Sequence, residues 1–224
     1  MTLPLGPETD SWPRPLPSRE RMAGTRVVLE PLHRRHVADL WDAAKHAGDS
    51  FTYMSYGPFE TRAGLEAFIA ANTAVPDPVF WAIRPLTLGR AVGWLSLMSI
   101  EPKNAAIELG NIWFGPELQR TRAATEAMFL LLRHAADDLG YRRLVWKCNA
   151  LNAGSRAAAA RLGFTYEGTL RAHMTVKGRV RDTAMFSITA DEWPSRRDAM
   201  VAWLALDNFD DEGNALRSLA SFRA

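Results

Sequence analysis

The sequence predicts a mixed α/β fold, and three observations support this prediction. Segments with strand-like residues are interspersed with segments of helical periodicity. Three consecutive strand-like runs between residues 79 and 114 are separated by short turn signals, which is typical of an antiparallel meander. A Gly-Pro pair at 115–116 then ends the last run, and apolar residues recur at helical spacing up to residue 140. The predicted order is β-α-α-β-β-β-α-β-α-β-β, a mostly antiparallel sheet of about seven strands flanked by helices.

The first elements are one strand and two helices. Residues 26–31 form a strand that its proline ends, and residues 33–47 place their apolar side chains on one helical face. Thr61 is the expected N-cap of the next helix, which runs to residue 72. The aromatic loop 51–59 between the helices either lines a ligand site or covers the core.

The remaining elements complete the sheet. A strand at 144–149 follows the long helix, and a short helix covers 153–162. The predicted strands of the meander are 79–83, 91–100 and 105–114. The final pair, 164–174 and 181–188, is joined by a turn at residues 177–178.

Three parts of the chain differ in composition. Residues 1–24 are rich in proline and form an arm that is loose or docked, residues 25–194 form the main domain, and residues 195–224 form a helical extension. The extension could pack on the domain, bridge two subunits or cover the acceptor side. An exposed Trp203 and Leu206 would suit a homodimer contact.

Charge and cysteine content narrow the class of protein. The formal charge of +2 is too small to indicate nucleic acid or an anionic membrane as a partner. No apolar run approaches the roughly 18 residues needed to span a bilayer. The single cysteine, Cys148, excludes an intramolecular disulfide framework and suits a reducing compartment, so we expect a cytoplasmic protein.

The turn at residues 119–122 leads directly into the long helix and is a candidate anion site. The first N–H groups of a helix lack intrahelical acceptors, and the helix dipole favours negative charge there. Arg120 and Arg122 add two full charges to this end. The sequence therefore predicts a phosphate against residues 120–125.

These residues resemble the GNAT superfamily of acyl-CoA-dependent N-acyltransferases. The pyrophosphate loop of that family reads Gln/Arg-x-x-Gly-x-Gly/Ala, and this chain has Gln119, Arg122 and Ala124 at the three positions. A second block, from Asn149 through Ser155 to the Glu-Gly pair at 167–168, is similar to the RimJ/RimL-type branch, which acetylates protein N-termini. The resemblance covers residues 26–193.

The resemblance implies acetyl-CoA as co-substrate, with its pantetheine arm between two strands that splay apart, 105–114 and 144–149. A backbone N–H of the strand that ends at Phe114 would polarise the thioester carbonyl. The residues expected to contact acetyl-CoA are Trp113, Phe114, Gln119, Arg120, Thr121, Arg122, Ala123, Ala124, Thr125, Asn152 and Ser155.

Two residues are catalytic candidates. Glu108 lies among apolar residues in a central strand, where it is either the general base for the incoming ammonium or a solvent-facing residue at a strand end. Ser155 matches a serine proposed to protonate the departing thiolate in the RimL-like branch. It could instead be only a helix-cap residue, and we favour a contact with the cofactor. Many GNAT enzymes use a tyrosine four residues before the Gly-Phe pair, but Ala159 stands there, so that role is absent. Glu117 is a weaker candidate for the base, and we expect it to cap a turn or to face water.

Other polar residues have less defined expectations. Arg122 replaces a glycine that would allow positive φ, so either the loop has ordinary angles or the site is altered. Asn149 can bond the turn backbone or the cofactor. Cys148 lies in an apolar strand with no histidine near it in sequence, which favours direct transfer over a ping-pong route. The histidines show no ligand spacing, so no metal is expected.

The sequence therefore predicts an N-acetyltransferase in which a primary amine attacks acetyl-CoA directly in a ternary complex. A peptide or protein N-terminus is the usual acceptor of the branch, and related enzymes act on small amines. The alternative is a non-catalytic acyl-CoA-binding regulatory or scaffold protein, to which the altered loop and the absent tyrosine give some weight.

Overall fold

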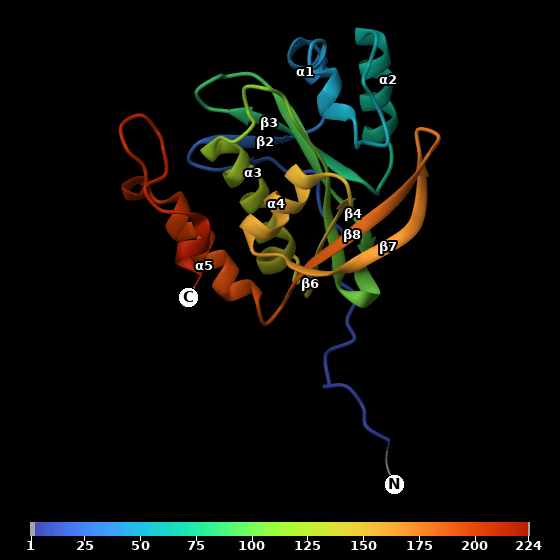
Figure 1. Ribbon diagram of the computed structural model, residues 1–224, viewed down its shortest axis with the longest axis vertical. Helices are drawn as coiled ribbons and strands as arrows, with labels where there is room; N and C mark the ends of the chain where they lie inside the picture. The colour runs from blue at the N-terminus through green and yellow to red at the C-terminus, as the bar shows by residue number, and fades with distance from the viewer. Residues whose placement is uncertain (1–2, 224) are drawn as a thin grey trace.

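A single sheet of eight strands forms the centre of the computed structural model, which describes residues 3–223 (Figure 1). The strand order is β1-β2-β3-β4-β5-β6-β8-β7, and β5 and β6 form the one parallel pair among these neighbours. The strands are β1 Met22–Ala23, β2 Val27–Pro31, β3 Val79–Pro85, β4 Gly93–Glu101, β5 Ala106–Phe114, β6 Arg143–Asn149, β7 Thr165–Val176 and β8 Arg179–Thr189. The predicted mixed α/β fold is confirmed.

Five α-helices accompany the sheet in the described chain: α1 Val37–Ala44, α2 Arg62–Thr73, α3 Arg122–Arg133, α4 Ala153–Leu162 and α5 Trp193–Leu204. Thr61 is the N-cap of α2 as predicted, because its side chain accepts the Gly64 N–H at 3.1 Å. A π-turn at His134–Asp138 continues α3 to the end of the predicted helical segment.

The sheet has one strand more than predicted. β1 pairs Met22 with Leu29 and Ala23 with Val28 at the edge of the sheet. Two residues carry no hydrophobic period, so nothing in the sequence separated them from the proline-rich arm.

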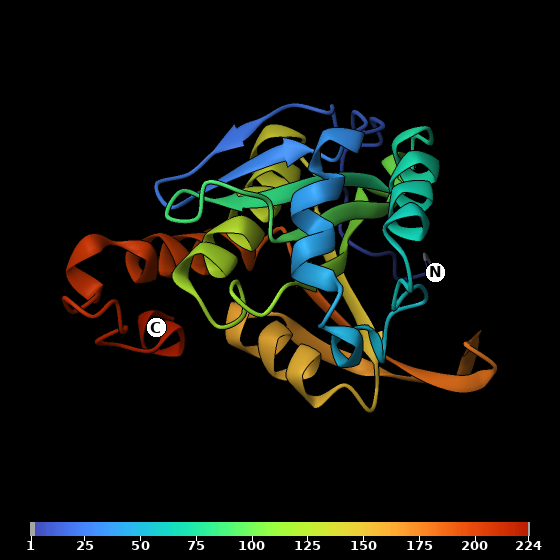
Figure 2. The same ribbon diagram turned by 90° about the horizontal axis from the view of Figure 1, so that it is seen from above.

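The helices lie in distinct places around the sheet. Figure 1 shows α3 and α4 next to each other in front of the strands, with α1 and α2 near the upper edge. α3 packs on β2 and β5, while α4 packs on β6 and β7. Seen from above, the C-terminal extension and the tip of the β7–β8 hairpin project from opposite ends of the molecule (Figure 2).

The aromatic loop 51–59 covers part of the core and also borders a cavity. Phe51 is fully buried and stacks on Trp113 with a centroid distance of 5.2 Å. Tyr56 accepts a hydrogen bond from the Trp94 indole at 2.9 Å. Tyr53, by contrast, lines the cavity between β5 and β6, described below. The loop therefore completes the core on one side and faces a cavity on the other.

β5 and β6 diverge as predicted. They pair only at Ala106–Arg143, Ile107–Leu144 and Glu108–Val145, although β5 continues to Phe114 and β6 to Asn149. An extra residue in β5 forms a bulge against β4, and Asn111 within it has φ of 50°. The facing edges beyond Glu108 are left without a strand partner.

The two ends of the chain pack on the domain. The arm is docked, since the Tyr141 hydroxyl donates to the Pro15 carbonyl at 3.1 Å and the Trp81 indole donates to the Glu20 carbonyl at 2.8 Å. Residues 1, 2 and 224, which belong to the predicted arm and extension, lie outside the described residues.

The C-terminal extension differs from its prediction in two ways. α5 begins at Trp193, so the predicted domain boundary after residue 194 falls inside its first turn. Trp203 is 7% exposed and packs edge-on against Phe209, which corrects the expectation that it is a surface residue. Leu206 is exposed as expected. None of the helices described in residues 3–223 is both long and apolar enough to cross a membrane.

Candidate functional site

The divergence of β5 and β6 opens a cavity of about 470 Å³. Its walls come from β5, β6, the start of α4, the β7–β8 hairpin and the loop after α1. Successive side chains of a strand point to opposite faces, so Lys147 and Asn149 lie on one face of β6 while Trp146 and Cys148 lie on the other. All four line the cavity, which therefore opens to both faces of the sheet.

Glu108 lies at the point where β5 and β6 part. It is 6% exposed, its Oε2 is 2.9 Å from the Lys147 Nζ, and it accepts a hydrogen bond from the Ser99 hydroxyl at 3.1 Å. A buried carboxylate needs such partners. Glu108 is thus a cavity residue, and the alternative of a solvent-facing residue at a strand end is wrong.

The start of α4 places Asn152 and Ser155 at the opposite wall. Asn152 is the N-cap, because its Oδ1 accepts the Ser155 N–H at 3.0 Å. The Ser155 hydroxyl accepts the Trp146 indole N–H at 3.0 Å, so its own proton points to another acceptor, such as the neighbouring Cys148 sulfur or a bound ligand. The capping role once considered for Ser155 therefore belongs to Asn152.

Two neighbouring groups have structural roles. The Asn149 Oδ1 accepts the Leu151 N–H at 2.9 Å, so this side chain stabilises the turn. Burial raises the pKa of the Cys148 thiol, although hydrogen bonding with Ser155 acts in the opposite direction. Cys148 is buried, and the raised pKa disfavours its thiolate, which is the nucleophilic form.

The start of α3 has both occupied and open amides. The Thr121 hydroxyl accepts the Ala124 N–H at 3.1 Å, and the Thr125 N–H reaches the Thr121 carbonyl at 3.4 Å. Within residues 3–223, the amides of Arg120, Arg122 and Ala123 have no protein acceptor. At the expected anion position, three N–H donors are thus open, whereas the prediction included all the residues from 120 to 125.

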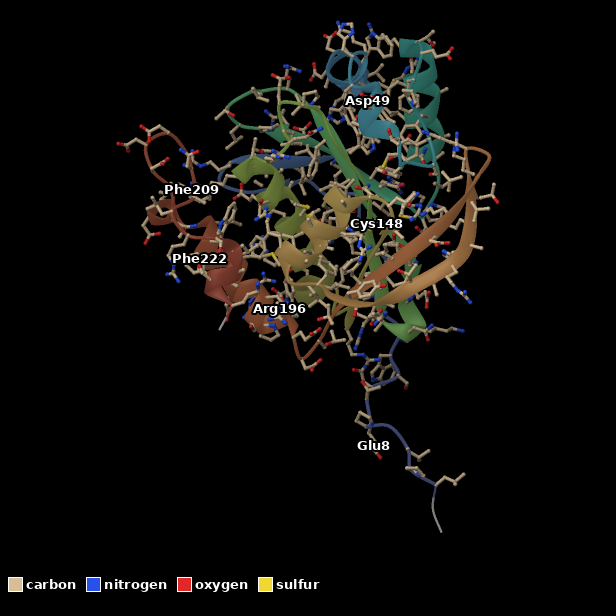
Figure 3. All side chains as sticks on the ribbon, in the orientation of Figure 1. Glu8, Asp49, Cys148, Arg196, Phe209 and Phe222 are labelled. Carbon is tan, nitrogen blue, oxygen red and sulfur yellow. The ribbon has the colours of Figure 1, made fainter. Side chains whose placement is uncertain are left out.

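The glycine that the family has at position 122 is not required here. Arg122 is the first residue of α3, and the positive φ of the loop falls on Arg120, at 61°. The Arg122 side chain points away from the loop, because its guanidinium donates to the Leu204 carbonyl and lies 4.0 Å above the Phe209 ring. Phe209 belongs to the C-terminal extension, far from Cys148 in Figure 3.

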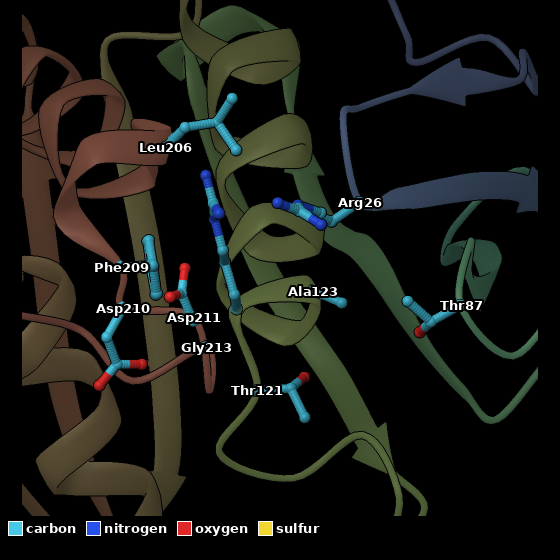
Figure 4. Close-up of a pocket in the computed structure, with 10 residues that line it drawn as sticks. Arg26, Thr87, Thr121, Ala123, Leu206, Phe209, Asp210, Asp211 and Gly213 are labelled. Carbon is cyan, nitrogen blue, oxygen red and sulfur yellow. The ribbon is translucent and has the colours of Figure 1, made fainter.

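A second cavity, of about 500 Å³, lies at this end of α3 (Figure 4). Thr121 and Ala123 form one wall, and residues 206–213 of the extension form the other. The guanidinium of Arg26 also points into it. Burial lowers the pKa of Arg122, and the neighbouring charge of Arg26 adds to this effect.

Other predicted cofactor residues occupy mixed positions. Trp113 is 1% exposed, and its indole donates to the Ser50 hydroxyl at 2.8 Å, so its side chain is not available to a ligand. Phe114 lines the gap, and its carbonyl accepts from the Gln119 amide at 3.0 Å. The Thr125 hydroxyl accepts a hydrogen bond from Arg161.

Sequence reasoning missed the three basic residues of the gap. Lys147 had a signal, because it is the one charged residue between the apolar positions 144 and 148 of its strand. His173 and Arg181 come from the β7–β8 hairpin and had none, because only the strand register brings them to β6. In the part of the chain that the structure describes, no group of three or more His, Cys, Asp or Glu side chains could hold a metal ion.

Comparisons with known proteins agree with this geometry. Residues 26–165 match the family model described as the acetyltransferase (GNAT) domain. The crystal structure of a GCN5-related N-acetyltransferase from Brucella melitensis is 43% identical, with a TM-score of 0.92, and the match covers 95% of this chain and 97% of that one. A structure of the GNAT family from Chromobacterium violaceum is 38% identical, with a TM-score of 0.79, and covers 86% and 100%.

Two curated relatives match shorter segments. The ribosomal-protein-serine acetyltransferase of Escherichia coli is 35% identical over 80 residues, which are 36% of this chain and 44% of that protein. A Bacillus subtilis relative is 28% identical over 109 residues, which are 49% of this chain and 59% of that protein. The chain thus spans about half the length of these relatives.

The family also accounts for the co-substrate. GNAT acetyltransferases use acetyl-CoA, which agrees with the co-substrate predicted from the loop and the splayed strands. The matched residues include the diverging strands and the start of α3. From the family model, the near-complete match to the Brucella structure and this geometry together, the chain belongs to the GNAT acetyltransferase family.

Proposed function

We propose that this protein transfers an acetyl group from acetyl-CoA to a primary amine by direct attack in a ternary complex. The gap between β5 and β6 supports this proposal, because it brings Glu108 and Ser155 to one cavity. An extended pantetheine arm has amides that can pair with the free edge of β5. The open amides of Arg120, Arg122 and Ala123 suit its diphosphate.

Each side chain has a defined role in the proposed reaction. Glu108 takes a proton from the acceptor ammonium, and the neutral amine then attacks the thioester carbonyl carbon. The C–N bond forms, the C–S bond breaks, and a main-chain N–H of β5 stabilises the developing oxyanion. Ser155 donates its hydroxyl proton to the departing thiolate and recovers one from the amine nitrogen through solvent.

The proposed acceptor is a peptide or protein N-terminus, and a small amine is the second candidate. The name of the Escherichia coli relative, a ribosomal-protein-serine acetyltransferase, favours a protein acceptor. The cavity is bounded by the loop after α1 and the β7–β8 hairpin. We assign acceptor selection to these two segments, since loops on a rigid scaffold commonly carry specificity.

Release of CoA thiol from acetyl-CoA tests the proposal. The wild type and Glu108→Gln are incubated with a panel of N-terminal peptides and small amines, and binding of CoA is measured by calorimetry. Amine-dependent thiol release that the substitution abolishes supports an enzyme. Clear CoA binding without turnover on any amine supports the non-catalytic acyl-CoA-binding protein instead, and the absence of binding contradicts both.

We further propose a cytoplasmic protein that forms a homodimer through the C-terminal extension. Val201 and Leu206 are 52% and 72% exposed on this extension, although Trp203 is not available for a partner. Sedimentation velocity of the full chain and of Leu206→Arg tests the dimer. A wild-type dimer that the substitution dissociates supports it, whereas a wild-type monomer contradicts it.

A further inference from the structure

The side of the gap that faces the β7–β8 hairpin is enclosed by two segments that contact each other. The Lys177 ammonium at the hairpin tip donates to the Phe51 carbonyl of the loop after α1 at 2.9 Å. Tyr53 of this loop and His173 of the hairpin both line the cavity. An acceptor that enters here meets side chains from both segments.

The charges in this cavity do not balance. The residues that line it include one carboxylate, Glu108, and two cationic side chains, Lys147 and Arg181. The Lys147 ammonium is 2.9 Å from Glu108 and offsets its charge. No carboxylate lies within 4 Å of the Arg181 guanidinium among residues 3–223. One positive charge therefore remains without a partner.

The Arg181 guanidinium also lacks hydrogen-bond acceptors that it needs. Its Nε is buried and has no hydrogen-bond partner among the described atoms. A buried donor without an acceptor destabilises the structure, and the effect is larger when the donor is charged. Arginine stays protonated under these conditions, so the group cannot avoid this cost by losing its proton.

Register places Arg181 on the same face as the Lys147 side chain. β8 pairs Met185 with Lys147 and Thr183 with Asn149, and Arg181 is two residues further along the strand. Side chains two residues apart on a strand share a face, so Arg181 lies on the same face as Asn149. Trp146, which contacts Ser155 of α4, lies on the other face. Arg181 is thus on the side of the gap that holds Lys147 and Glu108, where the acceptor amine would meet its proposed base.

We propose that Arg181 binds a carboxylate of the acceptor, so that this enzyme acetylates amines that carry a carboxylate near the reacting nitrogen. The inference rests on the proposed acetyl transfer. A guanidinium offers a carboxylate two parallel, charge-assisted N–H donors, whereas a neutral amide has one oxygen and no charge to pair with them. The carboxylate is either the α-carboxylate of a free amino acid or the side-chain carboxylate of a peptide that begins with an acidic residue.

Matched acceptor pairs test the inference and separate the two sources. Acetylation of L-alanine is compared with that of L-alaninamide, and peptide amides that begin with aspartate or glutamate are compared with those that begin with asparagine or glutamine. We expect kcat/KM to favour the carboxylate member of one pair by about tenfold or more. Arg181→Gln should remove this preference and leave the KM for acetyl-CoA unchanged.

A matched control and a binding measurement make each outcome informative. Arg171→Gln makes the same change at an exposed position of the hairpin that does not line the cavity, and it should behave as the wild type. Calorimetry of the same acceptors with the CoA-bound protein reports carboxylate binding even without turnover. Arg181-dependent binding without turnover would support the carboxylate site while contradicting the proposed acetyl transfer.

Three results would overturn the inference while leaving the acetyl transfer intact. Equal acetylation of both members of every pair is the first. Retention of the preference in Arg181→Gln, with a melting temperature that shows a folded variant, is the second. A rise in the KM for acetyl-CoA as the main effect of Arg181→Gln would assign the guanidinium to the co-substrate instead.

Discussion

The gap between β5 and β6 and the cavity at the start of α3 have similar volumes, about 470 and 500 Å³, but the chain builds them differently. The first is formed largely by strands of one sheet, whose positions the ladders on either side fix. The second has one wall from a helix start and another from the C-terminal extension, which lies outside the segment that matches the family. The difference indicates that the first cavity depends on strand pairing inside the segment that matches the family model, while the second depends on the C-terminal extension outside that segment.

The largest effect should come from the sheet-built cavity. Glu108→Gln keeps the size of the side chain but removes the base, so we expect kcat to fall about 100- to 10,000-fold. Initial rates of thiol release give kcat, and a melting curve shows that the variant is folded. Glu117→Gln is the control, because Glu117 is an exposed residue paired with Arg90. A kcat within threefold of the wild type would remove Glu108 from the chemistry.

The next effect concerns the helix-built cavity. Ala123→Asp puts a negative charge beside the three open amides, and we expect the KM for acetyl-CoA to rise about tenfold through repulsion of the diphosphate. Acidic residues suit the first turn of a helix, so folding should not suffer. Ala63→Asp makes the same change at the second position of α2, after its N-cap Thr61, and serves as the control. Equal KM values for the two variants would place the diphosphate elsewhere.

A smaller change is expected at the opposite wall of the gap. Ser155→Ala removes the hydroxyl that accepts from Trp146, and kcat should fall about three- to tenfold, because a thiolate leaves without much acid help. The KM for acetyl-CoA should change by less than the kcat. Measuring both constants separates the roles, since a change in KM alone would make Ser155 a binding residue.

The smallest expected effect tests how the extension supports its cavity. Phe209→Ala removes the ring between Arg122 and Trp203 and should lower the stability by about 1–2 kcal/mol. For a domain of this size the melting temperature should fall by about 2–8 °C. Leu216→Ala, at a residue that is 64% exposed on the same extension, is the control. An unchanged melting temperature would mean that the extension is not held by this contact.

Local signals in the sequence predicted much of the fold. Thr61 and the periodicity after it gave α2, and the turn residues gave the meander and the final hairpin. The divergence of β5 and β6 came from the resemblance rather than from periodicity. β1 was missed because two residues show no pattern, and the burial of Trp203 was missed because it depends on Phe209.

The candidate site was less predictable, because its geometry depends on contacts between distant residues. Glu108 was expected to be either a base or a surface residue, and the choice depends on Lys147, which the parallel pair brings close to it. The direction of Arg122 depends on Leu204, 82 residues later in the chain. Arg181 reaches the cavity only through the register of β8 with β6. No local pattern encodes these pairings.

The short junction of β5 with β6 has a mechanical consequence. Within residues 3–223, the ladder between β5 and β6 has three residue pairs, and all three lie at the start of the two strands. Main-chain bonds therefore offer little resistance to a change in the angle between the two halves. Their far ends, at Phe114 and Asn149, move the most for a given rotation because they are farthest from the junction. The main chain therefore restricts the width of the gap least at these far ends. An incoming molecule would need the gap to change its width there.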